Sequence, residues 1–106
     1  MTRFRVAPLD LIPEGTGLRV EAAGRHLALF RVGGRLHALG DRCSHAEASL
    51  ADGQVYEGTV ECPRHGATFD LLTGEALTFP ATRPVPVYRA DVEGGEVFVE
   101  LGEEGR

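Results

Sequence analysis

Apolar and polar residues alternate over short stretches along most of the chain, and no long stretch repeats with the helical period. Such alternation predicts strands that bury one face. The glycine pairs at 33–34 and 94–95 are strong signals for two-residue hairpin turns between strands. We therefore expect one hairpin in the N-terminal half of the chain and one near its C-terminus. The expected strands are residues 4–7, 18–22, 26–32, 35–39, 87–92 and 97–101.

The stretch between the two hairpins predicts a different organisation. Short strand-like pieces at 59–61 and 67–70 border two loops, and residues 44–51 leave room for one helical turn at most. Residues 79–86 contain three prolines, which predict a rigid, extended loop because proline fixes φ and lacks a backbone donor. Many short strands separated by turn signals favour an all-β sandwich or barrel.

Length and charge narrow the class of protein. A chain of 106 residues predicts a single domain, residues 1–106. The net charge of -5 argues against non-specific nucleic-acid binding, which needs a basic surface. The first residues lack the apolar segment of a signal peptide, and no apolar run has the length of a membrane span. We expect a soluble, cytoplasmic monomer that binds neither nucleic acid nor membrane.

The only two cysteines lie in the pattern C-x-H-x16-C-x2-H, formed by Cys43, His45, Cys62 and His65. Two thiolates and two imidazoles suit zinc, or a [2Fe-2S] cluster with both cysteines on one iron and both histidines on the other. Structural zinc sites usually use paired turns such as C-x2-C. Here each pair mixes the two residue types, which favours the cluster. A structural disulfide is less expected in the cytoplasm.

The segments Cys43-Ser44-His45 and Cys62-Pro63-Arg64-His65-Gly66 resemble the two ligand boxes of Rieske-type iron-sulfur proteins, in particular small bacterial Rieske ferredoxins. The resemblance covers most of the chain, and its cluster-binding region is about 41–70. It implies one [2Fe-2S] cluster per chain, with Cys43 and Cys62 on the buried iron and His45 and His65 on the outer iron. The implied fold is a stack of small antiparallel sheets with two cluster-binding loops. Pro80 is expected either in a third loop that covers the cluster, as in the family, or in a simple connector between sheets.

Departures from the family pattern predict a low reduction potential. Ala48 and Arg64 stand where Rieske proteins of the cytochrome complexes have a disulfide. Ala67 and Phe69 stand where those proteins have a serine and a tyrosine, whose hydroxyls bond to cluster and cysteine sulfurs. Loss of such bonds lowers the potential, toward the bottom of the roughly -150 to +300 mV Rieske range. Backbone amides must then donate instead; the candidates are His45, Ala46, Arg64, Gly66 and Ala67.

Several neighbouring residues receive ordinary interpretations. His26 and His37 lie in expected strands and are left out of the site. Asp70 is expected to cap a turn. Arg42 and Arg64 flank the ligands, and they assist docking, tune the reduction potential or are simply solvated surface residues. Three apolar residues are expected either to shield the cluster or to belong to the ordinary core: Leu50, Phe69 and Leu71.

The expected function is one-electron transfer, and the chain is not expected to be an enzyme. No nucleophile with a base, phosphate-binding loop, or flavin or nicotinamide motif is present. The resemblance implies a carrier from a flavin-dependent reductase to a terminal oxygenase or related redox enzyme. The alternatives are a redox sensor and a zinc-bound interaction module. A further alternative is a protein that resembles the small subunit of assimilatory nitrite reductase. That subunit shares the fold but lacks the ligands, so the intact ligand set of this chain argues against it.

Overall fold

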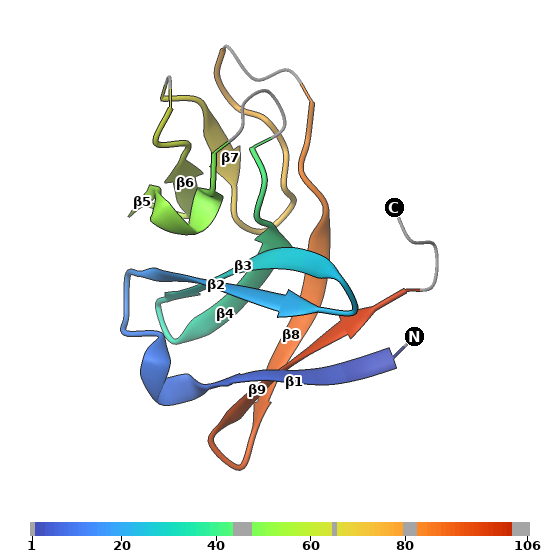
Figure 1. Cartoon of the computed structure of the whole chain (residues 1–106). Helices are drawn as coiled ribbons and strands as arrows, with labels where there is room; N and C mark the ends of the chain where they lie inside the picture. The colour runs from blue at the N-terminus through green and yellow to red at the C-terminus, as the bar shows by residue number, and fades with distance from the viewer. Residues whose placement is uncertain (1, 44–47, 65, 80–82, 103–106) are drawn as a thin grey trace.

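The computed structural model describes residues 2–43, 48–64, 66–79 and 83–102. Within these residues the chain is almost entirely β-structure, in two antiparallel sheets (Figure 1). The main sheet has the order β1–β9–β8–β4–β3–β2 and curls until its edge strands β1 and β2 approach each other, whereas the small sheet has the order β5–β6–β7. The strands are β1 (Thr2–Pro8), β2 (Gly17–Ala22), β3 (Arg25–Val32), β4 (Arg35–Gly40), β5 (Gln54–Tyr56), β6 (Thr59–Glu61), β7 (Thr68–Asp70), β8 (Val87–Glu93) and β9 (Glu96–Leu101).

Both hairpins expected from the glycine pairs are confirmed. Gly33 and Gly34 join β3 to β4 with φ of 61° and 77°, and Gly94 and Gly95 join β8 to β9 with φ of 60° and 79°. Two consecutive positive φ values turn the chain with the twist that antiparallel strands need. Glycine adopts them without a steric penalty because it has no Cβ.

The small sheet and two short 3-10 turns complete the described elements. Strand β5 was not expected, because Glu57, at a positive φ of 49° in the turn that joins β5 to β6, gives no turn signal in the sequence. One turn, η1 (Leu9–Leu11), directly follows β1. The other, η2 (Leu50–Asp52), overlaps the stretch in which one helical turn was expected and ends one residue beyond it.

Strand β3 separates two hydrophobic cores. Its run Leu27–Ala28–Leu29–Phe30 is fully buried, so both of its faces are covered. Leu27 and Leu29 face the core inside the main sheet, and Ala28 and Phe30 face the core shared with the small sheet. The second core also contains Cys43 and Cys62, so both thiols lie where the two sheets meet.

The proline-rich segment links the ligand region to β8. Val85 is buried and donates its N–H to Gly74 O at 2.9 Å, while Pro86 O accepts from Gly40 N–H at 2.9 Å. Residues 83–86 form no helix or strand, as expected, whereas Pro80 lies outside the described residues. Among the residues that the structure describes, no helix has the length and apolar character needed to cross a membrane.

Candidate metal centre

The two ligand loops begin in the same way. The N–H of Cys43 donates to Ala48 O at 3.0 Å, and the N–H of Cys62 donates to Ala67 O at 2.7 Å. Each cysteine therefore ends one arm of a hairpin-like loop and pairs with an alanine five residues later. The sequences of the two loops are only loosely alike, but their backbone closure is the same.

These closures bring the two thiols together in the core. Cys43 is 2% exposed and Cys62 is 1% exposed, and their side chains are within hydrogen-bonding reach of each other without forming a disulfide. The N–H of Arg64 donates to the Cys62 sulfur. This agrees with one of the backbone donors expected from the sequence. Gly66, another candidate, instead donates its N–H to Cys62 O at 3.2 Å.

The electrostatics of the two thiols fit a cationic group between them. Burial raises the pKa of the Cys62 thiol, and the neighbouring Cys43 thiol raises it further, whereas the Arg64 N–H lowers it. Two adjacent thiolates out of contact with water repel each other unless a positive charge compensates them. Iron held by Cys43 and Cys62 would supply that charge and would deprotonate both thiols.

The histidine half of the expected ligand set, His45 and His65, lies outside the described residues. The described part of the chain therefore contributes two of the four expected ligands, one from each loop. Their softness and burial suit the inner iron of a [2Fe-2S] cluster.

The surroundings of the thiols are dry and apolar. Leu50, Phe69 and Leu71 are all buried in the same core as Cys43 and Cys62, a position that agrees with both interpretations, shielding of the cluster and ordinary core. Ala67 and Phe69 are fully buried, and neither side chain offers a hydroxyl.

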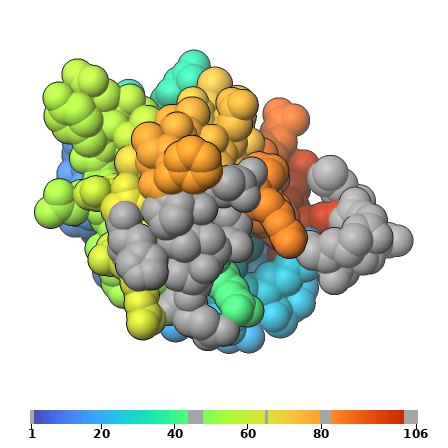
Figure 2. All heavy atoms as spheres, turned by 90° about the horizontal axis from the view of Figure 1, so that it is seen from above, coloured from blue at the N-terminus to red at the C-terminus, as the bar shows by residue number. Residues whose placement is uncertain are grey.

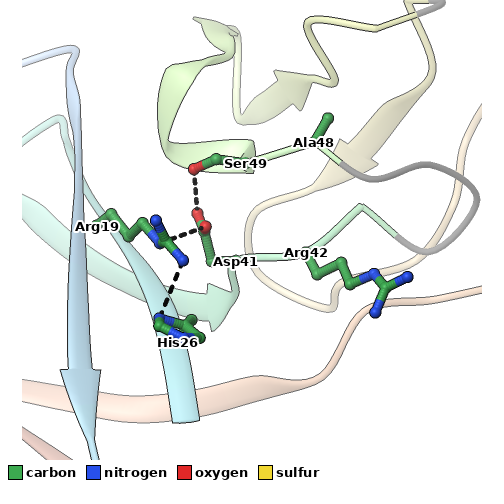
Figure 3. Close-up of a pocket in the computed structure, with 6 residues that line it drawn as sticks. All are labelled: Arg19, His26, Asp41, Arg42, Ala48 and Ser49. Carbon is green, nitrogen blue, oxygen red and sulfur yellow. Dashed lines mark hydrogen bonds and ion pairs between the residues drawn. The ribbon is translucent and has the colours of Figure 1, made fainter.

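A buried carboxylate beside the first ligand loop received no role in the sequence analysis. Asp41 is 3% exposed and lies against a cavity of about 260 Å³ (Figure 3). Its carboxylate accepts hydrogen bonds from Ser49 Oγ at 2.7 Å and Ala51 N–H at 3.0 Å, and it pairs with Arg19. An isolated aspartate after a strand carries no signal of such partners, because they come from distant parts of the chain.

The two remaining histidines lie in strands, as expected. His26 is on β3 beside Arg19, and His37 is on β4 with its ring hydrogen-bonded to the Leu71 carbonyl. Burial lowers the pKa of His37, and the charge of Arg35 lowers it further, although the bond to Leu71 opposes this. Neither histidine is among the expected ligands.

Asp70 caps a turn, which confirms the expectation. Its Oδ1 accepts from the N–H groups of Leu72 at 2.7 Å and Thr73 at 3.0 Å. The turn returns the chain toward β7, where the Thr68 carbonyl accepts from Leu77 N–H.

An exposed apolar segment accompanies the second ligand loop. Thr68 N–H donates to Thr78 Oγ1 at 3.0 Å, which fixes the segment 77–79 beside β7. Leu77 is 45% exposed and Phe79 is 83% exposed. Figure 2 looks onto this end of the molecule, where the orange segment before residue 80 lies against the yellow second loop. This end therefore offers apolar surface next to the loops.

Comparison with known proteins identifies close relatives. The Rieske [2Fe-2S] domain family model matches residues 2–89. The 3-phenylpropionate/cinnamic acid dioxygenase ferredoxin subunit of Escherichia coli (strain K12) is 46% identical over 104 residues, covering 97% of each chain. The ferredoxin of carbazole 1,9a-dioxygenase from Nocardioides aromaticivorans IC177 has a TM-score of 0.88 and 35% identity, over 93% of this chain and 97% of that chain. A chain in the complex of reduced oxygenase and oxidized ferredoxin of carbazole 1,9a-dioxygenase has a TM-score of 0.84 and 37% identity, over 92% of this chain and 91% of that chain.

Proposed function

The chain belongs to the Rieske [2Fe-2S] domain family, and we propose from this premise that it carries single electrons to a terminal oxygenase. Its cofactor is a Rieske-type [2Fe-2S] cluster. Its relatives are ferredoxin subunits, so it is an electron-transfer component and not the catalytic component of such a system. When bound, the cluster accepts and releases one electron at a time.

The proposed ligands are Cys43 and Cys62 for the inner iron and His45 and His65 for the outer iron. The observation that carries this assignment is the meeting of the two thiols in the core, one from each loop, with closely similar backbone closures. The core excludes water from the inner iron, and the Arg64 N–H stabilises the Cys62 thiolate. We propose one cluster per chain, held by residues 41–70 of a single domain 1–106.

The proposed reduction potential is low for the Rieske class. Hydrogen bonds to cluster sulfurs favour the more negative, reduced state, so each missing donor lowers the potential. Support comes from Ala67 and Phe69, which are buried and have no hydroxyl to donate.

The proposed partners are a flavin-dependent reductase as donor and a terminal oxygenase, or a related redox enzyme, as acceptor. The ferredoxin in the carbazole 1,9a-dioxygenase complex is bound to its oxygenase. In this chain Leu77 and Phe79 supply exposed apolar surface beside the second loop, as a docking face requires. We further propose a soluble, cytoplasmic monomer.

Electron paramagnetic resonance of the dithionite-reduced protein tests the cofactor, together with iron, sulfide and zinc assays on the same sample. We expect a rhombic signal with iron and acid-labile sulfide in equal amounts. A silent spectrum with stoichiometric zinc, from protein purified without oxygen, would instead identify a zinc-bound interaction module.

Replacement of the Escherichia coli ferredoxin subunit in a reconstituted 3-phenylpropionate dioxygenase tests the carrier role. We expect this chain to support substrate turnover, since the two ferredoxins are 46% identical. A cluster-loaded protein that reduces no oxygenase would favour a redox sensor.

The substitution His45→Cys tests the histidine assignment. A thiolate in place of a neutral imidazole adds negative charge to the site, so the potential is expected to fall, as in all-cysteine clusters. Potentiometric titration measures the change. An unaltered potential in a cluster-loaded variant would remove His45 from the ligand set.

A further inference from the structure

Asp41 connects the two arms of the first ligand loop. It stands two residues before Cys43, on the arm that leaves β4. Its carboxylate Oδ1 accepts from Ser49 Oγ at 2.7 Å and from Ala51 N–H at 3.0 Å, both on the returning arm. Its backbone carbonyl accepts from Leu50 N–H at 2.7 Å. One buried residue therefore holds three consecutive residues of the opposite arm.

The same residue also ties the loop to the main sheet. The N–H of Asp41 donates to His26 O on β3 at 3.0 Å. Arg19 Nε on β2 lies 3.2 Å from Asp41 Oδ2. Arg19 Nη2 donates to His26 Nδ1 at 3.1 Å, because a guanidinium has no acceptor. Figure 3 shows the resulting chain of contacts from His26 through Arg19 and Asp41 to Ser49.

The two charges of this pair have unequal surroundings. The Asp41 side chain is 4% exposed, whereas the Arg19 side chain is 55% exposed. Water screens the arginine more than the aspartate, so the charges do not cancel completely at a buried point nearby. Cys43 is such a point: two residues of chain span at most about 7 Å, and Cys43 is itself buried.

We propose that the Arg19–Asp41 pair positions the first ligand loop and sets the reduction potential of the cluster. This inference rests on the proposed function, since it requires Cys43 to hold the cluster. The Asp41 charge disfavours an added electron, and the Arg19 charge offsets part of that effect. The hydrogen bonds of Asp41 fix the distance at which both charges act, because they bind the arm that carries Cys43 to the arm that returns.

Charge-removing substitutions of similar shape test the electrostatic part. Asp41→Asn retains an oxygen for Ser49 and Ala51, and Arg19→Gln removes the exposed cation. We expect Asp41→Asn to raise the reduced-to-oxidised ratio at a fixed ambient potential by about tenfold, which is 59 mV for one electron. Arg19→Gln should lower that ratio, and the double variant should lie between the two single variants.

A second ion pair of the same kind supplies the control. Arg5 and Glu96 join β1 to β9 with an Nη1–Oε1 distance of 2.9 Å on the exposed surface of the main sheet. Arg5→Gln and Glu96→Gln change the net charge as the test variants do. They are expected to leave the potential unaltered, because exposed charges at longer range are screened.

Ser49→Ala tests the positioning part, because it removes one hydrogen bond and no charge. We expect faster release of iron to a chelator and a broadened paramagnetic resonance signal, with a smaller change in potential than in Asp41→Asn. Iron release and spectra equal to those of the parent protein would overturn the positioning role.

The outcomes separate this inference from the proposed function. A parent protein without iron and sulfide would overturn both. A cluster-loaded parent whose Asp41→Asn and Arg19→Gln variants shift the potential in the same direction, or no further than Arg5→Gln, would overturn this inference alone. If Asp41→Asn does not fold, Arg19→Gln still decides the sign, because its side chain is largely exposed.

Discussion

Ala67 and Phe69 are fully buried in the core that contains the two thiols. Neither side chain has a hydroxyl group that could donate a hydrogen bond to sulfur. The backbone can replace such donors only where an N–H is free of other partners. The Arg64 N–H reaches the Cys62 sulfur, whereas the Gly66 N–H is used by the Cys62 carbonyl. We therefore expect the residue at position 67 to have a strong effect on the reduction potential.

Ala67→Ser is expected to raise the reduction potential. A hydroxyl there adds a donor close to the Cys62 loop in a site without competing water. Potentiometric titration followed by visible absorption measures the shift, and Phe69→Tyr should act in the same direction. If both variants keep the cluster and the parent potential, hydroxyl donors do not determine the potential of this chain.

His37 should make the stability of the fold depend on pH. Burial lowers its pKa in the folded state below the ordinary value, so below about pH 6.5 the unfolded chain binds more protons than the folded chain. The stability that depends on neutral His37 should therefore be complete above about pH 6.5. The free energy of unfolding should fall as the pH drops below this value. His37→Gln should reduce the dependence.

Urea unfolding of the parent and the His37→Gln variant at about pH 8 and about pH 5 checks this prediction. Between the higher and the lower pH, the free energy of unfolding should decrease more in the parent protein than in the His37→Gln variant. An equal difference at both values would show that His37 contributes nothing to the dependence.

At the residue scale, the sequence predicts a site whose residues are marked by a short motif. The spacing of Cys43 and Cys62 places each at the start of a loop, and the structure brings them together. The role of Asp41 could not be predicted. Its partners Arg19 and Ser49 lie on both sides of it along the chain and meet only after β2 and the first ligand loop have packed.

At the element scale, the connection from η2 into β5 depends on close backbone contact. A Cβ on Gly53 would lie 2.0 Å from Glu61 O, at the end of β6. No side-chain rotation relieves a clash with a backbone carbonyl. This contact places the start of β5 against the end of β6, the strand that precedes Cys62.

Gly53→Ala is expected to destabilise the fold by about 3 kcal/mol, the upper end of the usual cost of overpacking (about 1–3 kcal/mol), because the obstructing atom belongs to the backbone. Thermal unfolding of the cluster-loaded protein measures the loss, and faster iron release should accompany it. Gly24→Ala is the control: its Cβ would meet nothing within 4 Å, so only the strain of its φ of 78° is tested. Equal losses in both variants would contradict a role for the close contact.

Hairpins with a two-glycine turn were predictable at this scale. The glycine pair predicts a turn, and the apolar–polar alternation on either side of it predicts the two strands that the turn joins. Strand β5 was not predictable, since its turn to β6 has Glu57 at a positive φ of 49° before Gly58 at 80°, and a glutamate does not signal a turn in the sequence. The continuous burial of β3 was also missed. Residues 26–32 were expected to form a strand that buries one face, whereas the fold has a core on each side of it.

At the scale of the whole molecule, the apolar segment 77–79 lies at the end that carries the second ligand loop (Figure 2). Electron transfer needs a short path, so we expect the proposed partner to contact this end. Phe79 is 83% exposed there, and large aromatic side chains often dominate the binding energy of interfaces.

Phe79→Ala is therefore expected to raise the ferredoxin concentration needed for half-maximal oxygenase turnover by roughly five- to thirtyfold, which corresponds to about 1–2 kcal/mol. The reconstituted 3-phenylpropionate dioxygenase is the assay. Leu11→Ala is the control. Leu11 is another exposed apolar side chain (57% exposed), but it lies in η1, on the main-sheet side of the molecule. Equal effects of the two substitutions would place the docking face elsewhere.

The pairing of β1 with β9 has a practical consequence. Thr2 lies opposite Leu101 in the main sheet, so the two described chain ends are neighbours, and both strands lie away from the ligand loops (Figure 1). A tether attached at either end would hold the molecule by its main sheet. Immobilised in this way on a gold surface or a bead, the protein would present the loops to the solution, where a freely diffusing acceptor can reach them.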